Sequence, residues 1–297
     1  MSTLFTSISE LRTVSERGTL NDAAIIAQSG TIAWVGPASE APAADEKVDL
    51  GGRAVLPGWV DSHTHMVFDG DRSAEFEARI SGGSYEAGGI AVTMDATRQA
   101  GTDRLDQLVA DRVAAGRRGG TTTFETKTGY GLNTESEVEA AKVASRHVDD
   151  VTFLGAHLVP PGADAEEYLD EVVGPMLEGV APYVQWIDVF CERGAFNEEQ
   201  SRRVLEAGKK LGLDLRVHGN QLGEGPGVAL AVELGAASVD HVNHLTDEDV
   251  ELLANSDTVA TMLPACDLST REPLAPGRTL LDAGATLAIA SNLNPGT

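Results

Sequence analysis

The stretch VLPGWVDSHTHMVFDGDR, residues 55–72, joins an apolar run to two histidines that are separated by a single residue. Successive side chains of a strand point to opposite faces, so His63 and His65 lie on the same face. Two neutral imidazoles on one face at the end of a strand can bind a metal ion, but the His-x-His pattern alone is a weak motif. Whether His63 and His65 indicate a metal site therefore depends on the fold that the surrounding sequence predicts.

From Arg53 onward, short apolar runs alternate with segments of helical periodicity. This alternation predicts a parallel sheet, and eight runs in series predict an α/β fold of the (β/α)8, or TIM, barrel type. An open doubly wound sheet is the alternative, but no Gly-x-Gly-x-x-Gly loop follows the first run. The eight runs are AVLPGWVDSH (54–63), TTTFETKTG (121–129), VTFLGAHL (151–158), WIDVFCE (186–192), LRVHGN (215–220), SVDHVN (238–243), TVATMLP (258–264) and TLAIASN (286–292).

The N-terminal part of the chain is rich in β-type sequence instead. The segment AAIIAQSGTIAWVG (23–36) alternates and turns at Ser29-Gly30, which predicts a hairpin. We expect residues 1–54 to form the N-terminal part of a small β domain and residues 55–297 to form the barrel. Since the chain stops five residues after the eighth run, we also expect it to be truncated, without the last helix and further strands of the small domain.

Composition excludes several classes of partner. The formal net charge of -24 and the pI of about 4.5 argue against nucleic acids and anionic membranes. No apolar run is long enough to span a bilayer, and the N-terminus lacks the features of a signal peptide. Two cysteines, Cys191 and Cys266, are too few for a disulfide framework. We therefore expect a cytoplasmic protein with small-molecule partners.

The histidines support a metal site. Five of the seven lie where predicted strands end, which is the catalytic face of such a barrel. One histidine at a strand end is ordinarily a packing or surface residue, but five are much harder to explain in that way. Three imidazoles and a water describe a catalytic zinc site. The five are His63, His65, His157, His218 and His241.

At this point the residues match a known family. PGWVDSHTH (57–65) resembles the strand-one metal motif of the amidohydrolase superfamily, and further blocks resemble the imidazolonepropionase family over nearly the whole chain. The resemblance implies a metal-bearing barrel with a small β-sandwich, a homodimer, and hydrolysis of the ring amide of 4-imidazolone-5-propanoate to N-formimino-L-glutamate in histidine degradation. The blocks are HTHMVFDGDR (63–72), EFEARISGGSYEAGGI (75–90), ETKTGYGL (125–132), FLGAHLVPP (153–161), DVFCERGAF (188–196), SRRVLEAGKKLGL (201–213), HGNQL (218–222) and LNPGT (293–297).

The resemblance also implies the metal ligands. One zinc or iron ion (Zn²⁺ or Fe³⁺) per chain is expected on His63, His65 and His218. The family carries an aspartate after strand eight, but SNLNPGT (291–297) has Asn292 in that place. An amide can offer its oxygen to a metal but cannot act as a base. We therefore expect a tolerated change with His241 carrying the proton, a slow or altered enzyme, or an inactive site.

The implied substrate contacts begin with Arg72, whose guanidinium fork suits a carboxylate; a loop salt bridge is its structural alternative. Gln221 matches a position beside the metal-bound water, where an amide cannot share proton work. His241 and Gln221 are thus the expected catalytic residues. The expected substrate-binding residues are Arg72, Tyr130, His157, Gln221, Asn294, Gly296 and Thr297.

Other polar residues near strand ends have two readings each. Glu125 and Lys127 line the barrel mouth or form a salt bridge within its rim, and Asp188 and Glu192 are candidates to orient metal-bound histidines. The loop SGGSYEAGGI (81–90) is shorter than in many relatives. Two functional alternatives stay open: a related cyclic amidohydrolase or deaminase for another heterocycle, and a defective barrel that binds without turnover.

Overall fold

The computed structural model describes residues 1–81 and 89–296. The chain forms two compact units, Met1–Trp59 and Val60–Thr297, which are described separately. Most of the loop expected to be short, and Thr297 with its expected substrate contact, lie outside the described residues. The assignment of residues 1–54 to a β-sandwich stays a prediction.

The first unit is a four-stranded sheet with the strand order β3-β2-β1-β4. Strands β1, β2 and β3 pair antiparallel, whereas β1 and β4 pair parallel. The hairpin turn that was predicted between β2 and β3 is present, with positive φ at both Ser29 and Gly30, as tight hairpins require. The elements are β1 (Ser2–Arg12), β2 (Thr19–Gln28), β3 (Thr31–Pro37), the 3-10 helix η1 (Ala38–Glu40) and β4 (Glu46–Val55).

The second unit contains eight strands whose spatial order follows the chain, from β5 to β12. Neighbouring strands from β6 to β12 pair in parallel. The residues after β5 meet those after β12, because Thr64 bridges Leu293 in a parallel pairing and closes the sheet into a barrel. The strands are β5 (Trp59–Asp61), β6 (Thr121–Lys127), β7 (Asp150–Ala156), β8 (Trp186–Cys191), β9 (Asp214–Gly219), β10 (Ser238–His241), β11 (Val259–Met262) and β12 (Leu287–Ile289).

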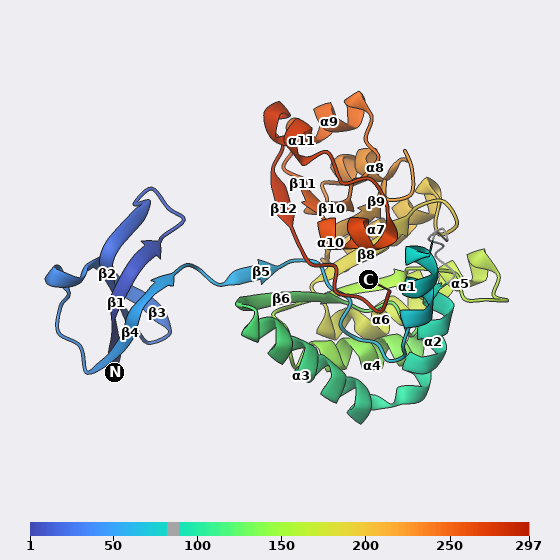
Figure 1. The fold of residues 1–297 in the computed structure, drawn as a ribbon. Coiled ribbons are helices and arrows are strands. Elements are labelled where there is room, and N and C mark those ends of the chain that lie inside the picture. The colour runs from blue at the N-terminus through green and yellow to red at the C-terminus, as the bar shows by residue number, and fades with distance from the viewer. Residues whose placement is uncertain (82–88, 297) are drawn as a thin grey trace. The chain divides into compact units, whose positions relative to one another are not determined.

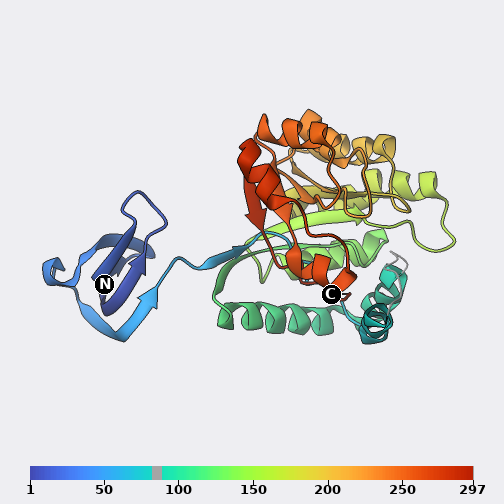
Figure 2. The ribbon, with the colours of Figure 1, turned by 45° about the horizontal axis from the view of Figure 1, so that its top comes forward.

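Helices cover the outside of these strands (Figures 1 and 2), and one large apolar core fills the space between the two layers. The predicted (β/α)8 barrel is therefore confirmed. The helices are α1 (Ser73–Ile80), α2 (Gly89–Ala100), α3 (Thr102–Arg118), α4 (Thr134–Ala144), α5 (Ala165–Glu171), η2 (Val172–Met176), α6 (Leu177–Val180), η3 (Ala181–Tyr183), α7 (Glu198–Lys210), α8 (Gly227–Leu234), α9 (Asp247–Ala254), α10 (Pro264–Thr270) and α11 (Gly277–Ala283).

Helix α7 shows why the sequence folds in this way locally. Asn197 and Gln200 form a reciprocal capping box at its start, and two lysines lie in its last turn, where they complement the helix dipole. Val204 and Leu205 are buried on its inner face. Gly208 permits close packing on β8, since a Cβ there would lie 2.4 Å from Ile187 Cγ2. Such contacts fix the outer layer and hold the strand ends in register.

None of the helices in the described ranges is both long and apolar enough to cross a membrane.

Candidate active site

The predicted site residues gather at the carboxyl ends of the barrel strands. His63 and His65 follow β5, and His157 follows β7. His218 lies in β9, and His241 is the last residue of β10. Pairing aligns His218 with Phe190 of β8 on one side and with Asp240 of β10 on the other. The register therefore places these side chains at one level of the barrel mouth.

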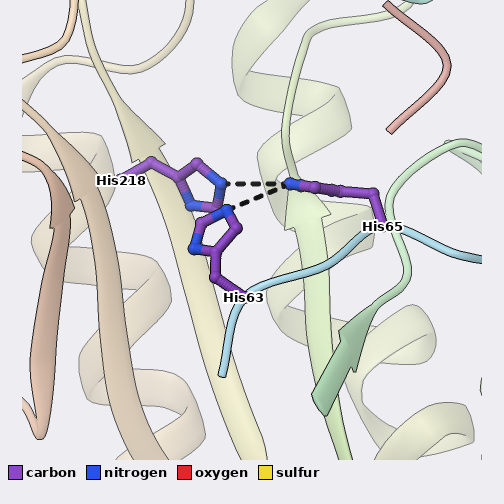
Figure 3. Close-up of side chains that lie close together, drawn as sticks. All are labelled: His63, His65 and His218. Carbon is purple, nitrogen blue, oxygen red and sulfur yellow. Dashed lines mark hydrogen bonds between the residues drawn. The ribbon is translucent and has the colours of Figure 1, made fainter. Parts of the chain in front are cut away.

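Three imidazoles converge on one point. His65 Nε2 lies 3.3 Å from His63 Nε2 and 3.4 Å from His218 Nε2 (Figure 3). Nitrogens bound to a tetrahedral ion at 2.0–2.1 Å are about 3.3–3.4 Å apart. All three histidines are buried. The residues present therefore fit a metal ion with three histidine ligands.

Buried carboxylates orient two of these imidazoles. His63 donates its Nδ1 hydrogen to Asp240 Oδ2 at 2.6 Å. His218 Nδ1 lies 3.0 Å from Asp188 Oδ2. A carboxylate at Nδ1 keeps the proton there and leaves the Nε2 lone pair for the ion. Asp188 is thus the partner of His218, as its prediction as a residue that orients a metal-bound histidine allowed. Asp240, the partner of His63, was not predicted from the sequence, although it directly precedes His241.

Lys127 connects the two carboxylates. Its Nζ lies 3.0 Å from Asp188 Oδ2, 3.8 Å from Asp240 Oδ2 and 3.0 Å from Glu125 Oε1. Burial alone would lower the pKa of Lys127, but the three surrounding carboxylates raise it above its ordinary value. The side chain is fully buried. Of the two readings of Glu125 and Lys127, the structure supports the ion pair inside the barrel.

Four histidines of the site, His63, His65, His157 and His241, are held neutral. Burial, followed by the charge of Lys127, lowers the pKa of His63 well below its ordinary value. Burial and the neighbouring imidazoles do the same for the pKa of His65. Burial lowers the pKa of His157 to about 4, and burial together with His218 lowers that of His241 to about 3. Neutral imidazole is the form that binds metal and accepts protons.

A single narrow cavity joins this cluster to most of the predicted substrate residues. Phe190 of β8 and Cys266 of α10 line the cavity as well, and neither was predicted from the sequence. A single aromatic residue in a strand and a single thiol in a helix carry no distinctive spacing signal. The lining residues are His65, Arg72, Tyr130, His157, Phe190, His218, Gln221, His241, Cys266, Asn292 and Asn294.

Arg72 lies at the wall of this cavity with its fork on a carboxylate. Its Nε and Nη2 donate to the two oxygens of Glu75 at 2.8 and 2.6 Å. Gly296 packs on the guanidinium so closely that a Cβ there would lie 3.0 Å from Arg72 Cζ. The structure therefore brings Arg72 and Gly296 together, and the ion pair with Glu75 is the loop salt bridge expected as the structural alternative for Arg72.

The loop after β6 carries Tyr130 and is fixed from below by Glu137 of α4. Glu137 Oε1 accepts from the backbone N–H groups of Gly131 and Leu132 at 2.7 and 2.9 Å, and Oε2 accepts from Gly129 at 2.9 Å. His157 Nδ1 donates to the carbonyl of Gly129 at 2.8 Å. One buried carboxylate therefore positions the loop on which both predicted substrate contacts depend.

Unusual backbone conformations occur at three site positions. His241, Asn292 and Asn220, the neighbour of Gln221, all have positive φ, with values of 84°, 50° and 56°. Non-glycine residues in this region are uncommon and cluster at functional sites.

Glu192 Oε2 accepts from the backbone N–H of Gln221 at 2.9 Å. Glu192 thus positions the Gln221 loop, whereas the sequence proposed it as a partner of a histidine.

The chain is similar in sequence to known proteins over its whole length. No protein-family model matches the chain. An imidazolonepropionase of Arthrobacter sp. (strain FB24) is 64% identical over 308 residues, which cover 100% of this chain and 77% of the relative. The chain belongs to the imidazolonepropionase family. Another member, from Streptomyces griseus subsp. griseus, is 54% identical over 282 residues, or 94% of this chain and 72% of the relative.

Solved structures show the same fold at low identity. A triazine hydrolase from Arthrobacter aurescens matches with a TM-score of 0.72 at 16% identity, over 99% of this chain and 72% of that chain. A zinc-bound adenosine deaminase from Xanthomonas campestris matches with a TM-score of 0.69 at 16% identity, over 99% and 70%. The imidazolonepropionase family therefore shares its barrel with hydrolases and deaminases. Membership of this family indicates a hydrolase that acts on a cyclic amide.

Proposed function

We propose that the chain hydrolyses the ring amide of 4-imidazolone-5-propanoate to N-formimino-L-glutamate. One observation carries this proposal: a single cavity is lined by His65 and His218 of the three-histidine cluster and by Arg72. A substrate with a stable ring amide and a carboxylate tail needs a metal at one end and a fork of donors at the other. Family membership supports the same reaction.

We assign the metal to His63, His65 and His218, with the amide oxygen of Asn292 as a fourth protein ligand. When bound, the ion would supply Lewis acidity, which lowers the pKa of a bound water toward neutral pH and polarises a carbonyl group. Asp240 and Asp188 keep the protons of His63 and His218 on Nδ1. The donor set suits either zinc or iron, and we propose one such ion per chain.

The remaining roles follow from charge and hydrogen-bonding capacity. Arg72 binds the substrate carboxylate, which replaces Glu75 on the guanidinium fork. We assign proton transfer from the attacking water to the leaving ring nitrogen to His241, because it lines the cavity beside the three-histidine cluster. The amide of Gln221 donates toward the oxygen that becomes negative.

Substrate contacts complete the proposed pocket. Tyr130 and His157, which the Gly129 loop positions, bind the ring and its substituents, and Asn294, Gly296 and Thr297 bind from the segment after β12. We further propose, from the family resemblance, that the enzyme acts in the cytoplasm as a homodimer.

The test is hydrolysis of 4-imidazolone-5-propanoate, followed as loss of ring absorbance with zinc or iron supplied. The chain would be compared with Asn292→Asp, Arg72→Met and the surface control Arg202→Met. We expect turnover by the chain, faster turnover by Asn292→Asp, and a KM for Arg72→Met that is raised by roughly 10- to 100-fold, since a charged hydrogen-bonded pair contributes about 1.5–3 kcal/mol. Arg202→Met should retain the KM of the chain.

Each alternative function has its own signature in this experiment. An unchanged KM for Arg72→Met would favour a heterocycle without a carboxylate. Turnover only by Asn292→Asp would show that the pocket binds this substrate and that the amide of Asn292 prevents catalysis. Metal binding by folded protein without turnover of any variant would contradict the proposed reaction.

A further inference from the structure

Two groups of metal-binding side chains in the described ranges have ligand atoms close enough to share one ion. The first is the three-histidine cluster. The second consists of His241, Cys266 and Asp267, which each offer one ligand atom within 4.8 Å of the other two. The proposed reaction gives Cys266 and Asp267 no role.

We propose that His241, Cys266 and Asp267 form a second metal site, which binds a thiophilic divalent ion such as Zn²⁺ or Cd²⁺. Nitrogen, sulfur and carboxylate ligands together favour such ions over Mg²⁺ or Ca²⁺, because a thiolate is a soft ligand. A lone cysteine would not define a site, but here histidine and carboxylate atoms accompany it.

The fold brings the three ligands together from neighbouring strands. His241 is the last residue of β10 and has a φ of 84°. Cys266 and Asp267 lie near the start of α10, which directly follows β11, and β11 pairs with β10. Nitrogen, oxygen and sulfur ligands of one tetrahedral zinc ion are about 3.3–3.8 Å apart. The three ligand atoms, which lie within 4.8 Å of one another, would therefore move together by up to about 1 Å to bind an ion.

Unsatisfied polar atoms point to a missing ligand at this place. His241 is 2% exposed and Asp267 is 1% exposed. Neither His241 Nδ1 nor Asp267 Oδ2 has a hydrogen-bond partner in the described part of the chain. An unsatisfied buried polar atom costs about 1–3 kcal/mol. Gln221 Nε2 donates to Cys266 Sγ at 3.9 Å, so the sulfur already acts as an acceptor.

Occupation of the second site has a consequence for catalysis. Cys266 and His241 line the same cavity as the three-histidine cluster. An ion on His241 takes the lone pair to which we assigned proton transfer, so excess zinc should inhibit hydrolysis. This inhibitory effect rests on the proposed function, whereas the binding site does not.

The binding test uses the full chain loaded with one equivalent of zinc and then titrated with cadmium chloride. Sulfur-to-cadmium charge-transfer absorbance in the ultraviolet reports only an ion bound to a thiolate, and the three-histidine cluster has none. Cys191→Ser is the matched control, because Cys191 is equally buried and lies outside the cluster. We expect the band to reach its limit at one cadmium per chain, to persist in Cys191→Ser and to vanish in Cys266→Ser.

Asp267→Asn keeps the thiol and the shape of the site. We expect it to weaken cadmium binding by at least about tenfold, since even partners outside the ligand shell contribute 10- to 100-fold to metal affinity. Absence of the band in the chain, its persistence in Cys266→Ser, or unchanged affinity in Asp267→Asn would each overturn the second site. Asp267→Asn decides the matter if Cys266→Ser does not fold.

Zinc inhibition is measured separately. Hydrolysis by the chain should fall as zinc exceeds one equivalent, whereas Cys266→Ser should resist that inhibition. The cadmium titration requires no turnover, so a failure of the proposed reaction and a failure of the second site give different results.

Discussion

At the scale of single residues, the metal-binding histidines are held by buried carboxylates, and those carboxylates are held by Lys127. Lys127 lies within 4 Å of carboxylates on two other strands, and each of those carboxylates holds a metal-binding histidine. Removing one partner from a buried ion pair costs far more than a surface pair contributes. The affinity for metal should therefore respond to a residue that does not bind the metal.

Lys127→Met tests this dependence. The change leaves Glu125, Asp188 and Asp240 buried without their cation, so we expect unfolding by urea to require about 3–5 kcal/mol less free energy, and metal affinity to fall with it. Lys142→Met removes a partly exposed lysine that lies 3.9 Å from Glu139, and should change stability by less than about 0.5 kcal/mol. Equal stability of the two variants would contradict the role of Lys127.

At the scale of elements, the order of strands and helices could be predicted from the sequence, but the hydrogen-bonded pairs of side chains between strands could not. Eight apolar runs alternating with helical segments predict the barrel, because the period of the hydrophobic residues changes with each element. The convergence of His63, His65 and His218 follows from that prediction. The pairing of Asp188 with His218 and of Asp240 with His63 does not, since it depends on register between strands.

The β6–α4 loop provides a second case at this scale. Glu137 lies eight residues or fewer from the three N–H groups that it accepts from, yet nothing in ETKTGYGL marks it as their acceptor. Periodicity identifies which residues are buried, but it does not identify the hydrogen bonds that a buried carboxylate makes. The loop's conformation therefore became clear only from the structure.

Glu137→Gln tests the function of this loop. An amide nitrogen in place of one carboxylate oxygen faces an N–H donor, so we expect a loss of about 1–3 kcal/mol of stability and a higher KM through displacement of Tyr130. The change is measured by urea unfolding and by substrate titration. Glu139→Gln, on the same helix and partly exposed, should retain both properties.

At the scale of the whole molecule, burial of neutral histidines links stability to pH. The pKa values of His157 and His241 are lowered to about 4 and about 3, against about 6.5 in an unfolded chain. Between these values the unfolded state binds more protons, so the free energy of unfolding falls as the pH falls below about 6.5. Above that range this contribution is fully present.

We expect the metal-free chain to lose on the order of 2 kcal/mol per histidine between neutral pH and about pH 5. Urea unfolding at the two pH values measures this loss. His157→Gln should reduce the pH dependence, because it removes one of the buried histidines whose pKa is lowered. Stability that stays constant or rises on acidification would contradict this account.

The closure of the barrel has a further consequence. The backbone N–H of Asn292 donates to the carbonyl of His63 at 3.0 Å, and that of His65 donates to Leu293 at 2.7 Å. These bonds join segments that are more than two hundred residues apart in the chain. Two of the proposed metal ligands, His63 and His65, take part in them through their backbone atoms. Because a bound ion would hold these two segments together, we expect it to slow unfolding more than it changes the folding rate, so that the metal-loaded enzyme stays folded for longer than the metal-free enzyme.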